Sequence, residues 1–404
     1  MQSTPEGLRI HIGFFGRRNV GKSSLLNVLA NQNISIVSDV PGTTTDPVKK
    51  AMELIPLGPV LFIDTAGLDD VGDLGAERVR RSESILQRVD AAIVVTTEAS
   101  FGDYERQLIT DLESRKIPTI IAVNQADVAY PSTVFIGELA STKHPVIITS
   151  ATEKSGVKEL KQALIRSIPE KLAQERPILA DLLASGEVLI LVTPIDAEAP
   201  KGRIIMPQVQ ALRDALDHHI ISLVVQESEL AGTLDILKTP PALVITDSQA
   251  FEAVSTIVPE DIPLTSFSII FSRLKGDLNV FATGAQKLGE LTAESRILIA
   301  EACTHNPVEG DIGREKIPRW LRDKIGPGLT FDFVKGQDFH HAENLKTYDL
   351  IIHCGGCTLN RKGLLTRLDE AEAAGTPITN YGLVIAWVNG ILDRVLAPFD
   401  SIVK

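Results

Sequence analysis

Short apolar segments alternate with amphipathic segments along the whole chain. In the first part, five apolar runs bounded by polar residues predict strands, and four stretches with apolar residues at helical spacing predict helices. The expected strands are Leu8–Phe15, Val60–Ile63, Ala91–Val95, Thr119–Val123 and Val146–Ile148, and the expected helices are Lys22–Ala30, Ala76–Arg88, Asp103–Arg115 and Val157–Ile168. This alternation predicts an α/β fold with a mainly parallel sheet covered by helices on both faces.

The alternation returns twice after a charged stretch bracketed by prolines, 169–177, which is typical of a linker. The later expected elements are strands at Val188–Val192, Ile220–Val225, Ala242–Ile245, Arg296–Ala300, Thr330–Val334, Asp349–Ile352 and Thr376–Thr379, and a helix at Gln208–Ala215. A chain of 404 residues is long enough for two or three domains. We predict three α/β domains, 1–170, 178–265 and 266–404, each a mainly parallel sheet with flanking helices.

Acidic residues outnumber basic residues by 52 to 40, which gives the chain a net charge of -12 at pH 7. This charge repels phosphate backbones and no local basic stripe overrides it, so nucleic acid is not expected as a partner. No apolar run approaches the roughly 18 residues that a membrane span needs, and the first residues lack the basic and apolar regions of a secretory leader. We therefore expect a cytoplasmic protein with no membrane partner.

The segment Gly16–Ser23 fits the phosphate-binding pattern G-x-x-x-x-G-K-S and lies between an expected strand and an expected helix. Backbone amides beside the glycines can turn toward phosphates, Lys22 can reach the β and γ oxygens, and the hydroxyl of Ser23 can bind Mg²⁺. The candidate nucleotide-binding residues of this loop are Gly16, Asn19, Gly21, Lys22, Ser23 and Ser24.

Three further strand ends carry polar residues that suit a guanine nucleotide. Asp64 can hold Mg²⁺ through water, and the amide of Gly67, in the same D-T-A-G segment, can meet the γ-phosphate. In Asn124–Asp127 the terminal carboxylate can accept both donors of a guanine edge, which selects guanine over adenine. Ser150 and Ala151 follow the next strand and can offer backbone amides to the base oxygen. Four motifs in this order predict a GTP or GDP site.

The first domain resembles the translation-factor-related GTPases, and especially their tRNA-modification and ribosome-assembly branch. The resemblance rests on the G-R-x-N-V-G-K-S-S-L-x-N segment at Gly16–Asn27 and the P-G-T-T-x-D segment at Pro41–Asp46. It implies that Thr44 is the switch threonine that reaches Mg²⁺ when GTP is bound. The chain departs from the branch at Gln125, where lysine is usual, which predicts weaker stacking over the base.

The residue after the D-T-A-G segment is Leu68, where a Ras-like enzyme has the glutamine that orients water. An apolar side chain cannot position the attacking water, so we expect slow, Mg²⁺-dependent GTP hydrolysis in which Lys22, Thr44, Asp64 and Gly67 form the catalytic set. The resemblance also implies that Asn19 binds a potassium ion that stimulates hydrolysis. The alternative is that Asn19 only stabilises its own turn.

All three cysteines lie in the last predicted domain, in Cys303-Thr304-His305 and in His353-Cys354-Gly355-Gly356-Cys357. Each motif begins where an expected strand ends, and the carboxyl ends of parallel strands meet at one edge of a sheet. Three interpretations stay open: unrelated buried cysteines, a structural zinc site of the Cys3His type, and an iron-sulfur cluster held by the thiolates.

The C-x-H and H-C-x-x-C pattern, joined to this kind of GTPase domain, resembles the HydF family of [FeFe]-hydrogenase maturation GTPases. The resemblance spans all three domains and implies a [4Fe-4S] cluster on Cys303, Cys354 and Cys357, with an exchangeable fourth position on iron. His305 and His353 belong to the motif, and each either binds iron or forms a hydrogen bond near the cluster.

The resemblance also implies a scaffold role. Such a protein is a homodimer through its middle domain, receives a diiron precursor made by two radical-SAM maturases and delivers it to apo [FeFe]-hydrogenase. The alternative function is a ribosome-assembly or tRNA-modification GTPase with a structural zinc domain, which the acidic net charge disfavours.

Some charged residues are expected to have only structural roles. Glu98, Asp103 and Glu105 are predicted to form a solvated acidic face. His218 and His219 stand near a predicted helix end, where capping is favoured over metal binding. His340 and His341 are expected in a polar loop, where a solvated position or one near the metal ligands is favoured over direct metal binding.

Overall fold

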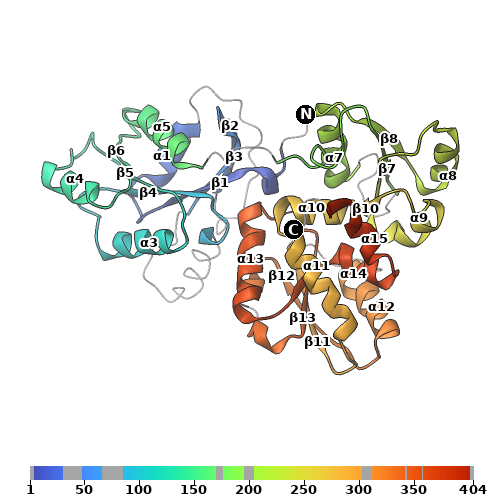
Figure 1. The fold of residues 1–404 in the computed structure, drawn as a ribbon. Helices are drawn as coiled ribbons and strands as arrows, with labels where there is room; N and C mark the ends of the chain where they lie inside the picture. Colours follow the sequence, from blue (N-terminus) through green and yellow to red (C-terminus); the bar gives the residue numbers. More distant parts are fainter. Residues whose placement is uncertain are drawn as a thin grey trace. The chain divides into compact units, whose positions relative to one another are not determined.

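The structure is a computed structural model. It describes residues 4–30, 48–65, 85–169, 176–194, 204–302, 311–341, 344–356 and 358–400. The chain divides into two compact units, Met1–Glu175 and Arg176–Lys404, and Figure 1 shows the elements of each. Most of the predicted helix Ala76–Arg88 and of the predicted linker lies outside the described residues.

The first unit is built on one sheet with strand order β2-β3-β1-β4-β5-β6. Its strands are β1 (Ile10–Phe15), β2 (Val48–Leu54), β3 (Gly58–Asp64), β4 (Ala91–Thr96), β5 (Thr119–Val123) and β6 (Val146–Ile148). All neighbours are parallel except β2, which runs antiparallel to β3 at the edge of the sheet. The mainly parallel α/β fold predicted from the sequence is therefore confirmed for this unit.

Helices cover both faces of this sheet. They are α1 (Lys22–Ala30), α3 (Asp103–Ser114), α4 (Thr133–Ala140) and α5 (Val157–Ser167). Ile12 and Phe14 of β1 point into a core with α1 and α5, whereas Phe15 points into a second core with α3 and α4. Side chains alternate between the two faces of a strand, so β1, which is buried on both faces, carries apolar residues on both, and His11 is its one polar residue.

The second unit contains two further parallel sheets, ordered β10-β9-β7-β8 and β12-β11-β13-β14. The strands are β7 (Val188–Val192), β8 (Ile221–Val225), β9 (Leu243–Thr246), β10 (Leu264–Ser266), β11 (Arg296–Glu301), β12 (Thr330–Lys335), β13 (Leu350–His353) and β14 (Ile378–Asn380). The helices are α7 (Met206–Asp217), α8 (Glu227–Ile236), α9 (Phe251–Ile257), α10 (Phe267–Lys275), α11 (Leu278–Gln286), α12 (Ile317–Lys324), α13 (Arg361–Ala374), α14 (Tyr381–Val388) and α15 (Leu392–Leu396). No described helix has the length and apolar character needed to cross a membrane.

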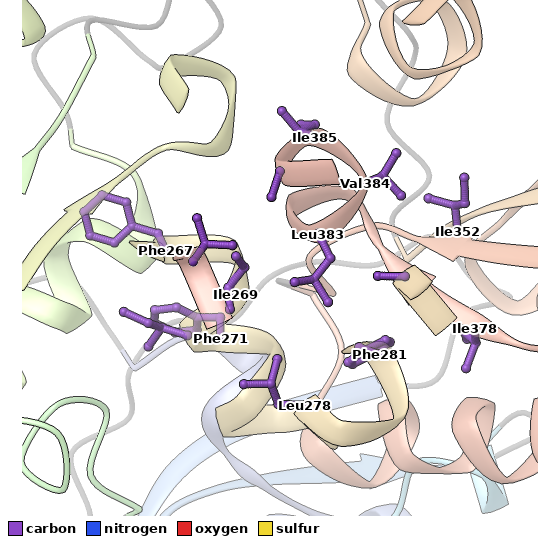
Figure 2. Close-up of a cluster of buried hydrophobic side chains, with 14 of the residues drawn as sticks. Phe267, Ile269, Phe271, Leu278, Phe281, Ile352, Ile378, Leu383, Val384 and Ile385 are labelled. Carbon is purple, nitrogen blue, oxygen red and sulfur yellow. The ribbon is translucent and has the colours of Figure 1, made fainter. Parts of the chain in front are cut away.

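One continuous apolar core joins these two sheets. Phe267 and Ile269 of α10 belong to the same buried cluster as Leu189 of β7 and Ile352 of β13, and Figure 2 shows the α10, α11 and α14 side chains of this cluster. Helix α10 follows β10 directly, and the hydroxyl of Ser266 accepts a hydrogen bond from its first turn. The predicted domain boundary between residues 265 and 266 stays a prediction, and the described core extends across that position.

The expected cap at the end of the Gln208–Ala215 helix is confirmed. His218 is the C-terminal cap residue of α7, and its Nδ1 lies 2.8 Å from the carbonyl oxygen of Asp214. His219 has a left-handed backbone, with φ at 58°, which ends the helix.

A buried histidine makes the first unit sensitive to acid. His11 of β1 is 1% exposed, and its Nε2 lies 3.0 Å from the carbonyl oxygen of Glu6. Burial lowers the pKa of His11 to about 4, and the charges of Arg88 and Lys49 add to this effect. The unfolded chain takes up its proton near pH 6.5, whereas the folded ring stays neutral down to about pH 4, so stability falls as the pH drops through this window.

We expect the first unit to lose roughly 3 kcal/mol of unfolding free energy between pH 6.5 and pH 4 through this group. The measurement is hydrogen exchange of β1 peptides by mass spectrometry, corrected for the intrinsic pH dependence of exchange. A His11→Phe variant should lack this part of the pH dependence. An unchanged slope in the variant would show that another group is responsible.

Candidate functional site

The Gly16–Ser23 loop follows β1 and opens α1, as the sequence predicts. Gly16 and Gly21 have φ values of 136° and 88°. A Cβ atom at Gly16 would collide with the carbonyl oxygen of Val95, so only glycine fits there. Lys22 is 5% exposed and its Nζ donates to the carbonyl oxygens of Gly16 and Arg17, the latter at 2.8 Å. The loop therefore curls around the lysine ammonium group.

The hydroxyl of Ser23 donates a hydrogen bond to the carboxylate of Asp64, the last residue of β3. Strand β3 is the parallel neighbour of β1, and Phe14 pairs with Asp64 in the ladder. The structure thus brings together Ser23 and Asp64, two of the residues predicted to bind Mg²⁺. Ser24, the next residue of α1 after Ser23, is exposed. Thr44 and Gly67 lie outside the described residues.

The guanine motif is tied directly to the phosphate loop. Asn124 Nδ2 donates to the carbonyl oxygen of Val20 at 2.9 Å, and its Oδ1 accepts from Thr149 Oγ1 at 3.1 Å. Gln125 Nε2 donates to the carbonyl oxygen of Asn19 at 2.7 Å. The side-chain amide of Asn124 thus links the phosphate loop, through Val20, to the end of β6, through Thr149. The sequence did not indicate this link.

Asp127 is held in its ionised form by the next motif. Ser150 Oγ donates to Asp127 Oδ1 at 2.6 Å, and this hydrogen bond lowers the pKa of the Asp127 carboxyl group. Ala151 follows Ser150 in the same turn. The structure therefore places the exposed Asp127 carboxylate beside the hydroxyl of Ser150, and the contacts of Asp127, Ser150 and Ala151 with guanine stay a prediction.

The prediction of a solvated acidic face is wrong for Glu105. Its side chain is fully buried and pairs with Arg17 of the phosphate loop, with 3.0 Å between Arg17 Nε and Glu105 Oε1. Glu105 Oε2 also accepts from the amide of Gly102 at 2.8 Å, which caps α3. Glu98 likewise accepts from the amide and the hydroxyl of Ser132, both at 2.6 Å. These carboxylates fix loops because they satisfy donors that would otherwise lack partners.

We expect Glu105→Gln to weaken GDP binding about tenfold, since a neutral amide holds the Arg17 guanidinium less firmly and loosens the phosphate loop. Titration with a fluorescent GDP analogue measures the affinity. Glu113→Gln, on the exposed face of the same helix, is the matched control. Equal affinities in the two variants would refute a role for Glu105 in holding the loop.

The cysteine motifs follow two neighbouring strands of the last sheet. Strands β11 and β13 are parallel partners, with Ala300 opposite His353, and they are followed by chain segments that lead to opposite edges of the sheet. In open α/β sheets ligands bind at such a switch point, at the carboxyl ends of the strands. The Cys354 amide donates to the Ala300 carbonyl at 2.9 Å, and the Ala302 amide donates to Cys354 Sγ at 3.1 Å.

Cys303, His305 and Cys357 lie outside the described residues. Within the described ranges, no group of three or more histidine, cysteine, aspartate or glutamate side chains is arranged to hold a metal ion. Because two of the three cysteines are not among those residues, the three-cysteine site stays a prediction.

His353 is buried and has a hydrogen-bond partner at each ring nitrogen. Nδ1 lies 2.6 Å from the carbonyl oxygen of Cys354, and Nε2 lies 2.8 Å from Arg367 Nη1. A carbonyl can only accept and a guanidinium can only donate, so Nδ1 carries the proton and Nε2 accepts. Burial, together with the Arg367 charge, lowers the pKa of His353 to about 3. The described contacts are those of a neutral, hydrogen-bonded ring.

His340 also differs from the prediction of a polar loop. It lies in a short 3-10 helix, Gly336–His341, and its ring is 5% exposed. Its Nδ1 lies 2.8 Å from Glu370 of α13. The histidine therefore links this turn to α13 instead of facing solvent.

The sheet order, the phosphate loop and the guanine motif define a P-loop GTPase domain, and residues 11–125 match the family described as 50S ribosome-binding GTPase. Residues 178–276 match the hydrogen maturase F dimerization domain, and residues 279–398 match the hydrogen maturase F tetramerization domain. These two matches cover more than half of the chain. The chain belongs to the hydrogen maturase F (HydF) family.

Two curated relatives, both tRNA modification GTPases, each match about two fifths of this chain. The tRNA modification GTPase MnmE of Chromobacterium violaceum is 33% identical over 172 residues, which cover 42% of this chain and 37% of the relative. MnmE of Geobacillus kaustophilus is 36% identical over 163 residues, covering 39% of this chain and 34% of the relative. The chain thus spans about a third of the length of these relatives. The G domain of the T. maritima FeoB iron transporter is 24% identical, with a TM-score of 0.31, and covers 41% of this chain and 99% of that domain.

Proposed function

We propose that this protein hydrolyses GTP slowly and acts as an iron-sulfur scaffold in [FeFe]-hydrogenase maturation, in the cytoplasm. It receives a diiron precursor from two radical-SAM maturases and delivers it to the apo-hydrogenase. The observation that supports this proposal is the presence, in one chain of the hydrogen maturase F family, of a nucleotide loop at one switch point and a cysteine motif at another.

In the GTPase unit, the residues take roles that follow from their positions. Lys22 would neutralise the β- and γ-phosphates, and Ser23 and Asp64, which are hydrogen-bonded to each other, would hold the Mg²⁺ that supplies positive charge next to the phosphates. Thr44 and Gly67 complete the γ-phosphate side. Asp127 accepts the donors of the guanine edge. Conversion of Asp127 to asparagine is a direct test of guanine selectivity, because an amide offers one acceptor where the carboxylate offers two.

The residues around Cys354 fit a cluster. Its sulfur accepts a backbone N–H from Ala302, which is the kind of contact that stabilises cluster thiolates. A Cβ atom at Gly355 would meet no atom of the described residues within 4 Å, so these residues leave room for a group on that side of the loop. Cys303 is the next residue after Ala302 in the sequence.

Cys303, Cys354 and Cys357 would hold the [4Fe-4S] cluster, and the cluster when bound supplies an iron position that exchanges its ligand. His353, whose Nε2 accepts a hydrogen bond from Arg367, would orient the loop. Substitution of His305 would test separately whether that residue binds iron. Anaerobic purification, metal analysis and electron paramagnetic resonance of the reduced protein test the cluster. Stoichiometric zinc without iron would instead favour a ribosome-assembly or tRNA-modification GTPase with a structural zinc domain.

Self-association is proposed through the middle sheet, in the part of the chain that matches the dimerization domain. Strand β8 lies at the edge of this sheet, where Ile221 and Val224 are 53% and 42% exposed. Such an edge can pair with another strand. Sedimentation velocity measures the homodimer, and a monomer at all concentrations would contradict it.

Potassium should raise the GTPase rate several-fold over sodium at equal ionic strength, because a cation at Asn19 would neutralise charge that develops in the transition state. Asn19 has a left-handed backbone with φ at 66°, so Asn19→Gly removes the side chain and keeps the loop geometry. Phosphate release in the two salts provides the measurement. The glycine variant should hydrolyse GTP at the same rate in potassium and in sodium. Equal rates for the wild type in the two salts would contradict a potassium site at Asn19.

A further inference from the structure

Two buried cations contact the loop that carries Cys354. Lys275, the last residue of α10, is 3% exposed, and its Nζ donates to the carbonyl oxygens of Gly356 at 3.2 Å and Leu359 at 3.0 Å. Arg367 of α13 is fully buried, and it donates to His353 Nε2 and to the carbonyl oxygen of Gly336. The two side chains come from different helices and contact the loop at residues on either side of Cys354.

Burying two cations is costly unless negative charge lies nearby. The acceptors at 353, 356 and 359 are an imidazole nitrogen and carbonyl oxygens, which offer dipoles but no net charge. Two acidic groups attract the Arg367 guanidinium. One is Glu370, which lies on the same helix, and the other is the thiolate form of Cys354 in the loop. Metal-bound thiolates in the cysteine loop would place further negative charge next to both cations.

We propose that Lys275 and Arg367 are positioning residues for an anionic metal-thiolate group at the 353–359 loop, where they fix its backbone and compensate its charge. This inference rests on the proposed cluster. Three thiolates contribute three negative charges, so the reduced group carries more negative charge than the oxidised group. Nearby buried cations stabilise the reduced form and raise the reduction potential, because charge and hydrogen bonding set the potential of such clusters.

The first test replaces Lys275 with methionine, which keeps the length of the side chain and removes its charge. Lys324→Met is the matched control, since Lys324 also donates to two backbone carbonyls, those of Trp387 and Val388, but at an exposed position. The full chain is reconstituted with iron and sulfide, and a redox titration followed by electron paramagnetic resonance gives the midpoint potential. Loss of iron to a chelator is measured in parallel.

We expect Lys275→Met to shift the midpoint potential to more negative values and to hold iron roughly 10- to 100-fold less tightly, the usual cost of losing a contact that supports a metal ligand. Lys324→Met should match the wild type in both measurements. Equal potentials in the two methionine variants would overturn the proposal for Lys275. Failure of the wild type to bind iron would instead overturn the proposed cluster.

Two variants at Arg367 test whether buried positive charge acts on the cluster even if Lys275→Met does not fold. Arg367→Lys keeps the charge and Arg367→Gln removes it, while both lose the fork that joins His353 to Gly336. The lysine variant should keep a potential close to that of the wild type, and the glutamine variant should not. Circular dichroism of the metal-free proteins reports folding separately. Equal potentials in these two variants would show that the buried charge does not act on the cluster.

Discussion

Cys354→Ser is expected to abolish cluster binding while GTP hydrolysis continues at close to the wild-type rate. Serine is nearly the size of cysteine, so the Ala302 amide keeps an acceptor, but its hydroxyl does not replace a thiolate as a ligand for iron. The nucleotide residues lie in Met1–Glu175 and Cys354 lies in Arg176–Lys404, which are separate compact units. Iron and sulfide content after anaerobic reconstitution, and phosphate release, are the two measurements.

Cys303→Ser should give the same result, because the proposed cluster needs all three sulfur atoms. Thr358→Ser is a suitable control, since residue 358 is exposed next to the motif. Loss of iron and of GTP hydrolysis together would contradict the division of labour between the two units. Full iron content in either cysteine variant would contradict the ligand set.

Lys22→Ala is expected to lower the rate of GTP hydrolysis at least about 100-fold, the order of effect seen when a charge-stabilising group is removed from an active site. The wild-type ammonium lies inside the phosphate loop, bonded to the carbonyls of Gly16 and Arg17, and alanine supplies neither the charge nor these contacts. Single-turnover phosphate release at saturating GTP measures the loss.

Lys158→Ala provides the control for this variant, because Lys158 is an exposed lysine on α5, where alanine suits a helix. The Lys22 variant should keep its iron. A rate within a few-fold of that of the control would mean that another group neutralises the phosphates. The ratio of the two rates therefore tests the role of Lys22 without interference from a general change in charge.

The sequence predicted the helix and strand bounds best at segments whose residues determine both the local backbone and the chemistry of the site. Helix α1 has the predicted bounds, Lys22–Ala30, because a glycine loop before an apolar helical repeat has few other solutions. The strands before Cys303 and His353 were placed within a residue or two, since buried parallel strands are short apolar runs. The expectation that a strand ends at each motif is confirmed by β11 and β13, and the structure adds that these two strands are neighbours.

An edge strand and contacts between distant segments could not be predicted from the sequence. Strand β2, which contains Lys49 and Lys50, was missed because an edge strand exposed on one side has no apolar run. Glu105 looked like a surface residue, since nothing in its own segment indicates Arg17, which lies 88 residues earlier. Nothing in the sequence around Lys275 and Arg367 indicates that they are buried, and only the folded chain shows both side chains at the Cys354 loop.

The short helix between β10 and the cysteine loop has a mechanical consequence. Its first residue follows Ser266 at the end of the middle sheet, and its last residue, Lys275, donates to the backbone at Gly356. Nine residues of helix form a stiff rod of about 14 Å, so displacement of one end is transmitted to the other. A partner that pulls on the middle sheet would thereby move the backbone next to the proposed metal site.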